Sequence, residues 1–195
     1  MPRNPAQSVD EVIVQPGVPA RRSKASDETQ ALLGLSEVMA KAPERALQRL
    51  VESAMRLTGA ESAGVSLEDT YDGQPVFRWV AVTGEFSRYA QATMPRHFSP
   101  CGTVVDRGET LVMRDPVRFF PYAADFHVPL RSALLTPFGR RGRRVGTVWV
   151  VSHDPRKDFS TDDVRIVEQM TTFSTSILDA LQVRSGKEKA RSPAD

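Results

Sequence analysis

The chain has 195 residues, of which 40% are hydrophobic and 26% charged, and a formal net charge of +2. This length fits one domain with tails, because domains cluster at about 100–150 residues. No apolar run approaches the roughly 18 residues that span a bilayer, and the near-neutral charge creates no field that would attract nucleic acid. The first residues lack the apolar centre of a secretory signal, and Cys101 is the only cysteine. We therefore expect a cytoplasmic protein with neither a membrane nor a nucleic-acid partner.

Two short basic runs depart from this balance, and their residues are Arg21, Arg22, Lys24, Arg140, Arg141, Arg143 and Arg144. Runs of this kind usually keep tails and turns solvated. A surface that binds nucleic acid also needs interleaved aromatic residues, which these runs lack. We interpret both as solvent-exposed segments.

The first part of the chain predicts a tail followed by two helices. Residues 1–26 contain several prolines and few large apolar side chains, so their composition predicts a disordered N-terminal tail. From Asp27 to about Lys41, apolar residues recur at helical spacing. Pro43 suits the first turn of a second helix, which Gly59 ends in the left-handed conformation.

The next segment predicts a hairpin and a connection. Strands are expected over residues 61–67 and 76–82, and the Asp72-Gly73 pair between them favours a tight turn. Residues 85–98 mix aromatic and polar side chains, which predicts a short helix and an irregular crossover.

A second irregular region follows this crossover. Ser99 is placed to cap a short helix that ends near Gly108, with Pro100 in its first turn. A short strand is expected over residues 111–113. The stretch 116–130 concentrates aromatic residues and is broken by prolines, which predicts a long loop with a helical turn.

The most strand-like segment of the chain covers residues 145–151, where β-branched, aromatic and small residues occupy both faces of the pleat. Since neither face is polar enough for water, this segment is predicted to be the central strand. Residues 133–138 are predicted to be its partner, joined by a turn from Gly139 to Gly142.

The closing helix has the clearest start signal. Ser160 and Asp163 form an acidic variant of the capping box. Apolar residues continue at helical spacing to about Val183, and residues 184–195 are predicted to be a disordered C-terminal tail.

Together these elements predict an α+β fold with a central antiparallel β-sheet. The order of segments 131–138, 145–151 and 159–163 resembles the C-terminal half of a GAF domain: a serine with an apolar strand and proline, a glycine-containing strand, and a phenylalanine-serine helix start. The resemblance extends back through Ser99-Pro100-Cys101-Gly102-Thr103.

The resemblance implies a GAF-like fold, related to PAS, in which terminal helices cover one face of the sheet and a helical crossover roofs a pocket on the other. It implies a GAF domain over residues 27–183, similar to those of bacterial sensor histidine kinases. Pocket segments of that family correspond here to segments that carry Phe98, Cys101, Met113, Phe119, Phe120, Tyr122, Phe126, His127, Ser132, Thr147 and Trp149. The alternative is that these side chains fill the core with no ligand. The family's motif for cyclic nucleotides is missing, and the cofactor is unknown.

Cys101 is the sharpest candidate for chemistry, because the first turn of a helix favours a thiolate. Its alternatives are a buried packing residue, a redox sensor and a catalytic thiol. Free methionine sulfoxide reductases of the GAF family carry a similar segment but rely on a second cysteine, which this chain lacks. Bilin-binding members commonly place a histidine after the cysteine, where this chain has Gly102.

Other catalytic or metal-binding patterns are missing from the sequence. His97, His127 and His153 are scattered without the spacing of metal ligands, so no metal is expected. Neither a nucleophile elbow nor a phosphate-binding glycine loop occurs. We therefore do not expect an enzyme.

The closing helix predicts a homodimer. Apolar residues on it step by three and four, as in a coiled-coil seam, and the expected interface comprises Leu32, Leu35, Met39, Val167, Met170, Ile177 and Leu181. The alternative is that the first helix covers this seam within one chain.

These observations predict a regulatory sensory domain in bacterial signal transduction. It would bind a small molecule or sense redox state in its aromatic pocket and pass the signal through the terminal helices to a downstream signalling protein. The alternatives are a thiol enzyme like the free methionine sulfoxide reductases and a dimerisation scaffold without ligand.

Overall fold

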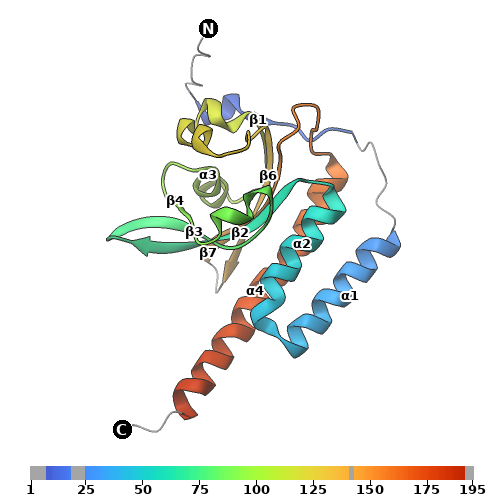
Figure 1. Cartoon of the computed structure of the whole chain (residues 1–195), viewed down its shortest axis with the longest axis vertical. Helices are drawn as coiled ribbons and strands as arrows, with labels where there is room; N and C mark the ends of the chain where they lie inside the picture. The colour runs from blue at the N-terminus through green and yellow to red at the C-terminus, as the bar shows by residue number, and fades with distance from the viewer. Residues whose placement is uncertain (1–7, 19–24, 141–142, 192–195) are drawn as a thin grey trace.

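The computed structural model describes residues 8–18, 25–140 and 143–191, and it is built on one seven-stranded sheet (Figure 1). Every pair of neighbouring strands is antiparallel. In spatial order the strands are β1 (Ile13–Val14), β5 (Leu111–Arg114), β6 (Ser132–Arg140), β7 (Arg143–Ser152), β2 (Ser62–Tyr71), β3 (Gln74–Gly84) and β4 (Thr93–Pro95). The predicted central strand is confirmed, since β7 lies in the middle of this order.

The helices divide between the two faces of the sheet. One face is covered by α2 (Ala46–Thr58) and the first turns of α4 (Thr161–Arg191), and α1 (Ala25–Lys41) packs against both helices; the three lie together in Figure 1. The other face is covered by α3 (Pro100–Arg107) and by irregular segments. This arrangement confirms the predicted α+β architecture, with the terminal helices on one face and the crossover on the other.

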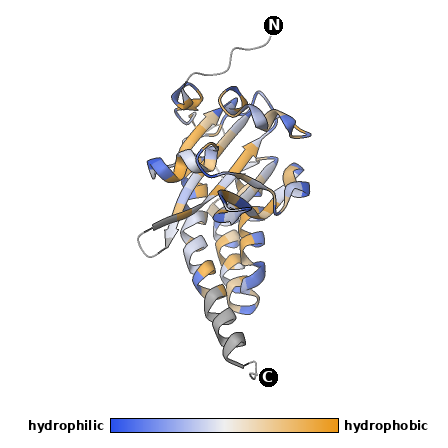
Figure 2. Cartoon of the chain, turned by 90° about the vertical axis from the view of Figure 1, so that its left-hand side faces the viewer, coloured by the Kyte–Doolittle hydropathy of each residue, from blue (hydrophilic) through white to orange (hydrophobic). Residues whose placement is uncertain are grey.

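The sheet separates two apolar cores. Leu50, Val51, Leu134, Val150 and Ile177 belong to the first, which we call the helix-side core. The second, which we call the pocket-side cluster, includes the rings of Phe77, Trp79, Phe86, Phe120 and Trp149. Figure 2 shows hydrophobic residues along the strands between the two layers, whereas the helices carry hydrophilic residues as well. Among the described residues, no helix combines the length and apolar character that crossing a membrane requires.

Local start and stop signals are confirmed where the sequence is most specific. Asp72 (φ 49°) and Gly73 (φ 73°) form the tight turn between β2 and β3, as left-handed residues in a two-residue hairpin should. Gly59 (φ 64°) ends α2. At the start of α4, the Ser160 amide donates to Asp163 at 2.8 Å and the Asp163 amide donates to the Ser160 hydroxyl at 3.3 Å.

The predicted N-terminal tail is wrong for residues 8–18. Residues 9–11 form a 3₁₀ turn, and Ile13 and Val14 pair with Met113 and Val112 on the edge of the sheet. The segment is ordered because its backbone pairs with the edge of β5 and because the Val12 side chain is fully buried. Residues 1–7 and 19–24, which include the first basic run, lie outside the described residues.

The predicted end of the closing helix is also wrong, because α4 continues to Arg191. Residues 184–191 are rich in Lys, Glu, Ala and Arg, which favour a helix strongly enough to outweigh Gly186. Residues 192–195 and the tip residues 141–142 lie outside the described structure, as do the side chains of Arg140, Arg143 and Arg144.

The predicted dimer interface lies largely inside the chain. Leu35, Val167, Met170 and Ile177 have no exposed surface, because α1, α2 and the sheet cover them. Leu32, Met39 and Leu181 are partly buried against the same core. The first two helices thus cover the seam within one chain, and the fully buried side chains cannot meet a second subunit; the oligomeric state itself stays a prediction.

Candidate functional site

The pocket-side cluster is covered by short, irregular elements. These are α3, the 3₁₀ turns η3 (Glu85–Tyr89), η4 (Pro116–Arg118) and η5 (Pro121–Asp125), and the loops that join them. Proline at the start of η4, η5 and α3 fixes the backbone there without a lost hydrogen bond. We call these covering elements the roof. Because they are short and irregular, they cannot pack on the sheet as regularly as a long helix does.

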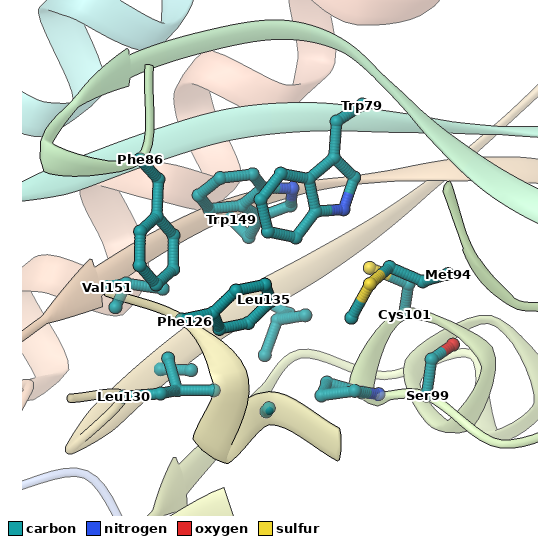
Figure 3. Close-up of a pocket in the computed structure, with 13 residues that line it drawn as sticks. Trp79, Phe86, Met94, Ser99, Cys101, Phe126, Leu130, Leu135, Trp149 and Val151 are labelled. Atoms are coloured by element: carbon teal, nitrogen blue, oxygen red, sulfur yellow. The ribbon is translucent and has the colours of Figure 1, made fainter. Parts of the chain in front are cut away.

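A cavity of about 40 Å³ lies between this roof and the sheet. Trp79, Leu135, Trp149 and Val151 line it from the strands. Phe86, Ala123, Phe126 and Leu130 line it from the roof, and Met94, Ser99 and Cys101 from the β4–α3 region. In Figure 3, Phe86 and Val151 mark one end of the cavity, and Met94 and Cys101 mark the other.

Four aromatic rings in contact with one another form part of the wall. The ring centroids of Trp79 and Trp149 are 4.8 Å apart, those of Phe86 and Phe126 are 4.9 Å apart, and those of Trp79 and Phe126 are 5.7 Å apart. These separations are typical of direct ring contacts. The rings therefore pack against each other and leave no cage in which a bulky cation would be enclosed.

The volume limits what the cavity holds in this conformation. On the same measure a cavity needs about 10–15 Å³ to hold one water molecule, and pockets for drug-sized ligands measure about 300–1,000 Å³. A volume of about 40 Å³ accommodates a molecule of a few heavy atoms. Anything larger requires the roof to move outward.

Polar groups at the cavity are few and uncharged. The indole Nε1 of Trp149 donates to the Ser66 hydroxyl at 2.9 Å, and the Cys101 thiol lies 3.5 Å from the same oxygen. The indole Nε1 of Trp79 is buried and has no acceptor among the described residues. In Figure 3 this nitrogen faces the end of the cavity marked by Met94 and Cys101. Trp79, a residue of the cavity wall, thus keeps an unused hydrogen-bond donor, although the surface of the cavity itself is entirely apolar.

Cys101 is held in place as the sequence predicts but is not exposed. The Ser99 hydroxyl accepts from the Gly102 amide at 3.1 Å, which caps α3. A Cβ at position 102 would lie 2.1 Å from the Arg96 carbonyl oxygen, so only glycine fits there. Cys101 itself is 5% exposed, and burial raises the pKa of its thiol above the usual value, an effect that the contact with Ser66 only partly offsets.

The predicted pocket residues separate into two groups. Cys101, Phe126 and Trp149 line the cavity. The rings of Phe98, Phe119, Phe120 and Tyr122 instead pack on one another beside it, with centroids between 4.9 and 6.3 Å apart.

The remaining predicted pocket residues also lie away from the cavity wall. Met113 is buried in the pocket-side cluster, and Ser132 and Thr147 are buried in the sheet. His127 is exposed, and its backbone amide donates to the Tyr89 hydroxyl at 2.9 Å. These side chains therefore do not form the cavity wall.

Several wall residues, above all Trp79, Phe86 and Met94, were not predicted from the sequence. One signal was available for Trp79, because the alternation in β3 puts it on the same face as Phe77. No comparable pattern marks Phe86 and Met94, whose positions depend on the path of the crossover.

A second hollow, of about 410 Å³, is a surface groove beside the tip of the β2–β3 hairpin. Glu68, Asp69, Arg96 and His97 contribute charged or titratable groups to it. Arg96 binds Glu68 at 2.6 Å and Asp106 at 2.7 Å, and so ties the hairpin to α3. Within the described residues, no three His, Cys, Asp or Glu side chains gather as metal ligands would.

Solved structures with the same fold support a family assignment. The GAF domain of a phosphoenolpyruvate-protein phosphotransferase from Coxiella burnetii aligns with a TM-score of 0.66 and 16% identity, over 86% of this chain and 99% of that one. Free methionine-R-sulfoxide reductase from Neisseria meningitidis, solved with its substrate, aligns with a TM-score of 0.62 and 16% identity, over 87% and 99%. The GAF-B domain of DevS from Mycobacterium smegmatis aligns with a TM-score of 0.54 and 18% identity, over 76% and 98%.

At these identities the structural matches establish the fold alone. Comparison of the sequence with curated proteins finds no match. A family model described as GAF domain matches residues 40–179, which is most of the chain. The chain therefore belongs to the GAF domain family.

Proposed function

We propose that this GAF domain is a sensor that binds a small, uncharged molecule in the aromatic cavity. The observation that carries the proposal is the indole N–H of Trp79, a residue of the cavity wall, which is buried without an acceptor among the described residues. A buried donor without a partner is unfavourable, and a ligand with one acceptor atom would relieve that cost. Regulatory and sensory roles are common in the GAF domain family.

The walls favour a neutral ligand. Of the described side chains that line the cavity, none is charged, so an ion would lose its hydration without gaining a partner. A zwitterion such as free methionine sulfoxide is therefore a poor fit. A few apolar atoms and one acceptor match the cavity best.

The signal would pass through the sheet. Trp149 lines the cavity, and its neighbour Val150 on β7 is buried against the terminal helices. The same alternation occurs on β6, where Leu135 faces the cavity and Leu134 faces the helices. A ligand that displaces the wall would therefore shift strands on which α2 and α4 rest.

A thiol enzyme is the weaker alternative. Its nucleophile would be Cys101, which is buried, has a raised thiol pKa, and has no second cysteine in the chain to resolve an oxidised form. A scaffold without ligand is the stronger alternative, because the cavity is small. Binding experiments separate it from the sensor.

The test uses benzene and pyridine, which have the same shape but differ in one acceptor nitrogen. Phe126→Ala removes a wall ring and should make the cavity large enough for either probe. Phe98→Ala is the matched control, because Phe98 is 43% exposed and lies outside the wall. We expect Phe126→Ala to bind both probes in ligand-detected NMR and Phe98→Ala to bind neither.

Trp79→Phe in the Phe126→Ala background then tests the donor. Loss of one hydrogen bond of about 1 kcal/mol should weaken pyridine binding roughly fivefold and leave benzene binding within about twofold. Failure of Phe126→Ala to bind either probe would refute the binding site. Equal losses for both probes would refute the role of the indole N–H.

A further inference from the structure

The N-terminal segment 8–18 lies outside the part of the chain that matches the GAF family model. It crosses the edge of the sheet and contacts both the cavity side and the start of α4. We propose that this segment, which we call the strap, couples α3 to the first turn of α4. The local stability of α3 then depends on that of the helix start, and the reverse. The use of the strap in sensing rests on the proposed function, whereas the coupling itself does not.

The cavity-side end of the strap is fastened to α3 and to the pocket-side cluster. Asp10 forms an ion pair with Arg107 in the last turn of α3, with 2.5 Å between Oδ1 and Nη2. Val9 and Ile13 pack against the pocket-side cluster. Since α3 also carries Cys101 in the cavity wall, this end of the strap follows the position of that wall.

The middle of the strap is a strand. The Arg114 amide donates to the Val12 carbonyl at 2.8 Å, and β1 continues this pairing along β5. Val12 is fully buried, while the neighbouring Ile13 and Val14 are half-buried. Such a short edge strand depends on the packing of few side chains, so one substitution can release it.

The far end of the strap is joined to α4. The Gly17 amide donates to the Phe159 carbonyl at 2.9 Å, and the Thr161 amide donates to the Gly17 carbonyl at 3.0 Å. Thr161 is the first residue of α4, and its amide has no acceptor within the helix. The strap thus supplies a hydrogen bond that the helix start lacks by itself.

These contacts form one continuous path. Movement of α3 changes the Asp10 contact, the strand transmits the change along β5, and Gly17 passes it to the helix start. The path runs around the edge of the sheet and is separate from the route through β6 and β7. Reciprocal coupling is required: loosening the helix start must also loosen α3.

Hydrogen exchange on the full chain tests the strap without any ligand. Val12→Asp puts a charge at the buried position, and Val18→Asp is the matched control because Val18 is 90% exposed in the same segment. For Val12→Asp we expect at least tenfold faster exchange at the amides of Arg114, Thr161 and α3, with the rest of α4 unchanged. For Val18→Asp we expect wild-type rates.

A milder variant keeps the test decisive if Val12→Asp unfolds the chain. Asp10→Asn removes one ion pair at the surface and should raise exchange two- to threefold at both α3 and Thr161. Faster exchange at α3 with no change at Thr161 would overturn the coupling, as would faster exchange confined to β5.

Hydrogen exchange with and without pyridine distinguishes the coupling by the strap from the proposed function. In Phe126→Ala protein, bound pyridine should slow exchange at Thr161, and Val12→Asp should abolish that protection. If pyridine never binds, the proposed function fails while the coupling between α3 and α4 stands on the exchange data. If pyridine binds and protects Thr161 equally with and without Val12→Asp, the strap is not the route of the signal.

Discussion

The two faces of the sheet are covered by different kinds of structure. On the helix side, long helices bring aliphatic side chains such as Leu50, Val51 and Met170 to the sheet, and these have no exposed surface. On the pocket side, short turns bring aromatic rings such as Phe86 and Phe126, and a cavity of about 40 Å³ remains. Both faces are apolar, so composition alone does not explain the difference.

Regularity of the covering elements explains it. Side chains on helices form ridges that fit into the grooves of their neighbours, and flexible aliphatic groups fill what is left. The roof over the pocket side consists of 3₁₀ turns and proline-fixed loops. Its aromatic rings are rigid, so they cannot change shape to fill small gaps. We infer that the helix side provides most of the stability and that the pocket side keeps space for a ligand.

The largest expected effect is a charge in the helix-side core. Ile177 has no exposed surface, and Ile177→Glu would bury a carboxylate among apolar side chains. We expect it to lower the free energy of unfolding by about 4–5 kcal/mol or more, a large share of the roughly 5–15 kcal/mol by which a typical domain is stable. Urea unfolding followed by circular dichroism measures the loss.

Leu33→Glu is the control for this variant. Leu33 is 61% exposed on α1, so the same new charge should change stability by no more than about 0.5 kcal/mol. A folded, stable Ile177→Glu protein with an altered native mass would contradict the burial of Ile177. It would place Ile177 in a subunit interface.

A smaller effect compares the two faces within one strand. Leu134 and Leu135 are neighbours on β6, but Leu134 lies in the helix-side core and Leu135 lines the cavity. We expect Leu134→Ala to cost about 3–5 kcal/mol and Leu135→Ala about 2–3 kcal/mol, because a side chain beside a void makes fewer contacts to lose. Chemical denaturation of both variants gives the difference.

The reverse order would show that the pocket side is the better packed face. Benzene provides a second readout, since Leu135→Ala enlarges a cavity that already exists, whereas Leu134→Ala opens one among the helices. We expect benzene to stabilise Leu135→Ala more.

The helix side could be predicted from sequence because its signals are local. Gly59, Ser160 and Asp163 mark helix ends through their own backbone and hydrogen-bonding preferences, and the spacing of apolar residues then assigns the buried face. The central position of β7 follows from its two apolar faces. These inferences need no knowledge of distant contacts.

The pocket side could be predicted only in part, because its geometry depends on distant contacts. Phe98 and Phe126 are both aromatic residues in irregular segments, yet one is partly exposed and the other lines the cavity. No periodicity distinguishes them, since neither belongs to a helix or a strand. The ordered structure of residues 8–18 could not be predicted for a similar reason. The strand edge that binds them is formed about a hundred residues later in the chain.

The smallest expected effect concerns the thiol of Cys101, which lies on α3 in the wall of the cavity. Burial raises the pKa of Cys101, so the folded chain keeps its proton at a pH at which the unfolded chain, with a thiol pKa near 9.0, loses it. The folded state then binds more protons, and its stability must fall as the pH rises above that of the unfolded thiol. Between pH 8 and pH 10 we therefore expect this group to reduce the free energy of unfolding as the pH rises. Denaturation of wild-type and Cys101→Ala protein across this range isolates the effect, because all other groups titrate in both. If the two proteins lose stability in parallel, the thiol is accessible to water in the native state, and the pocket side is more open than its packing indicates.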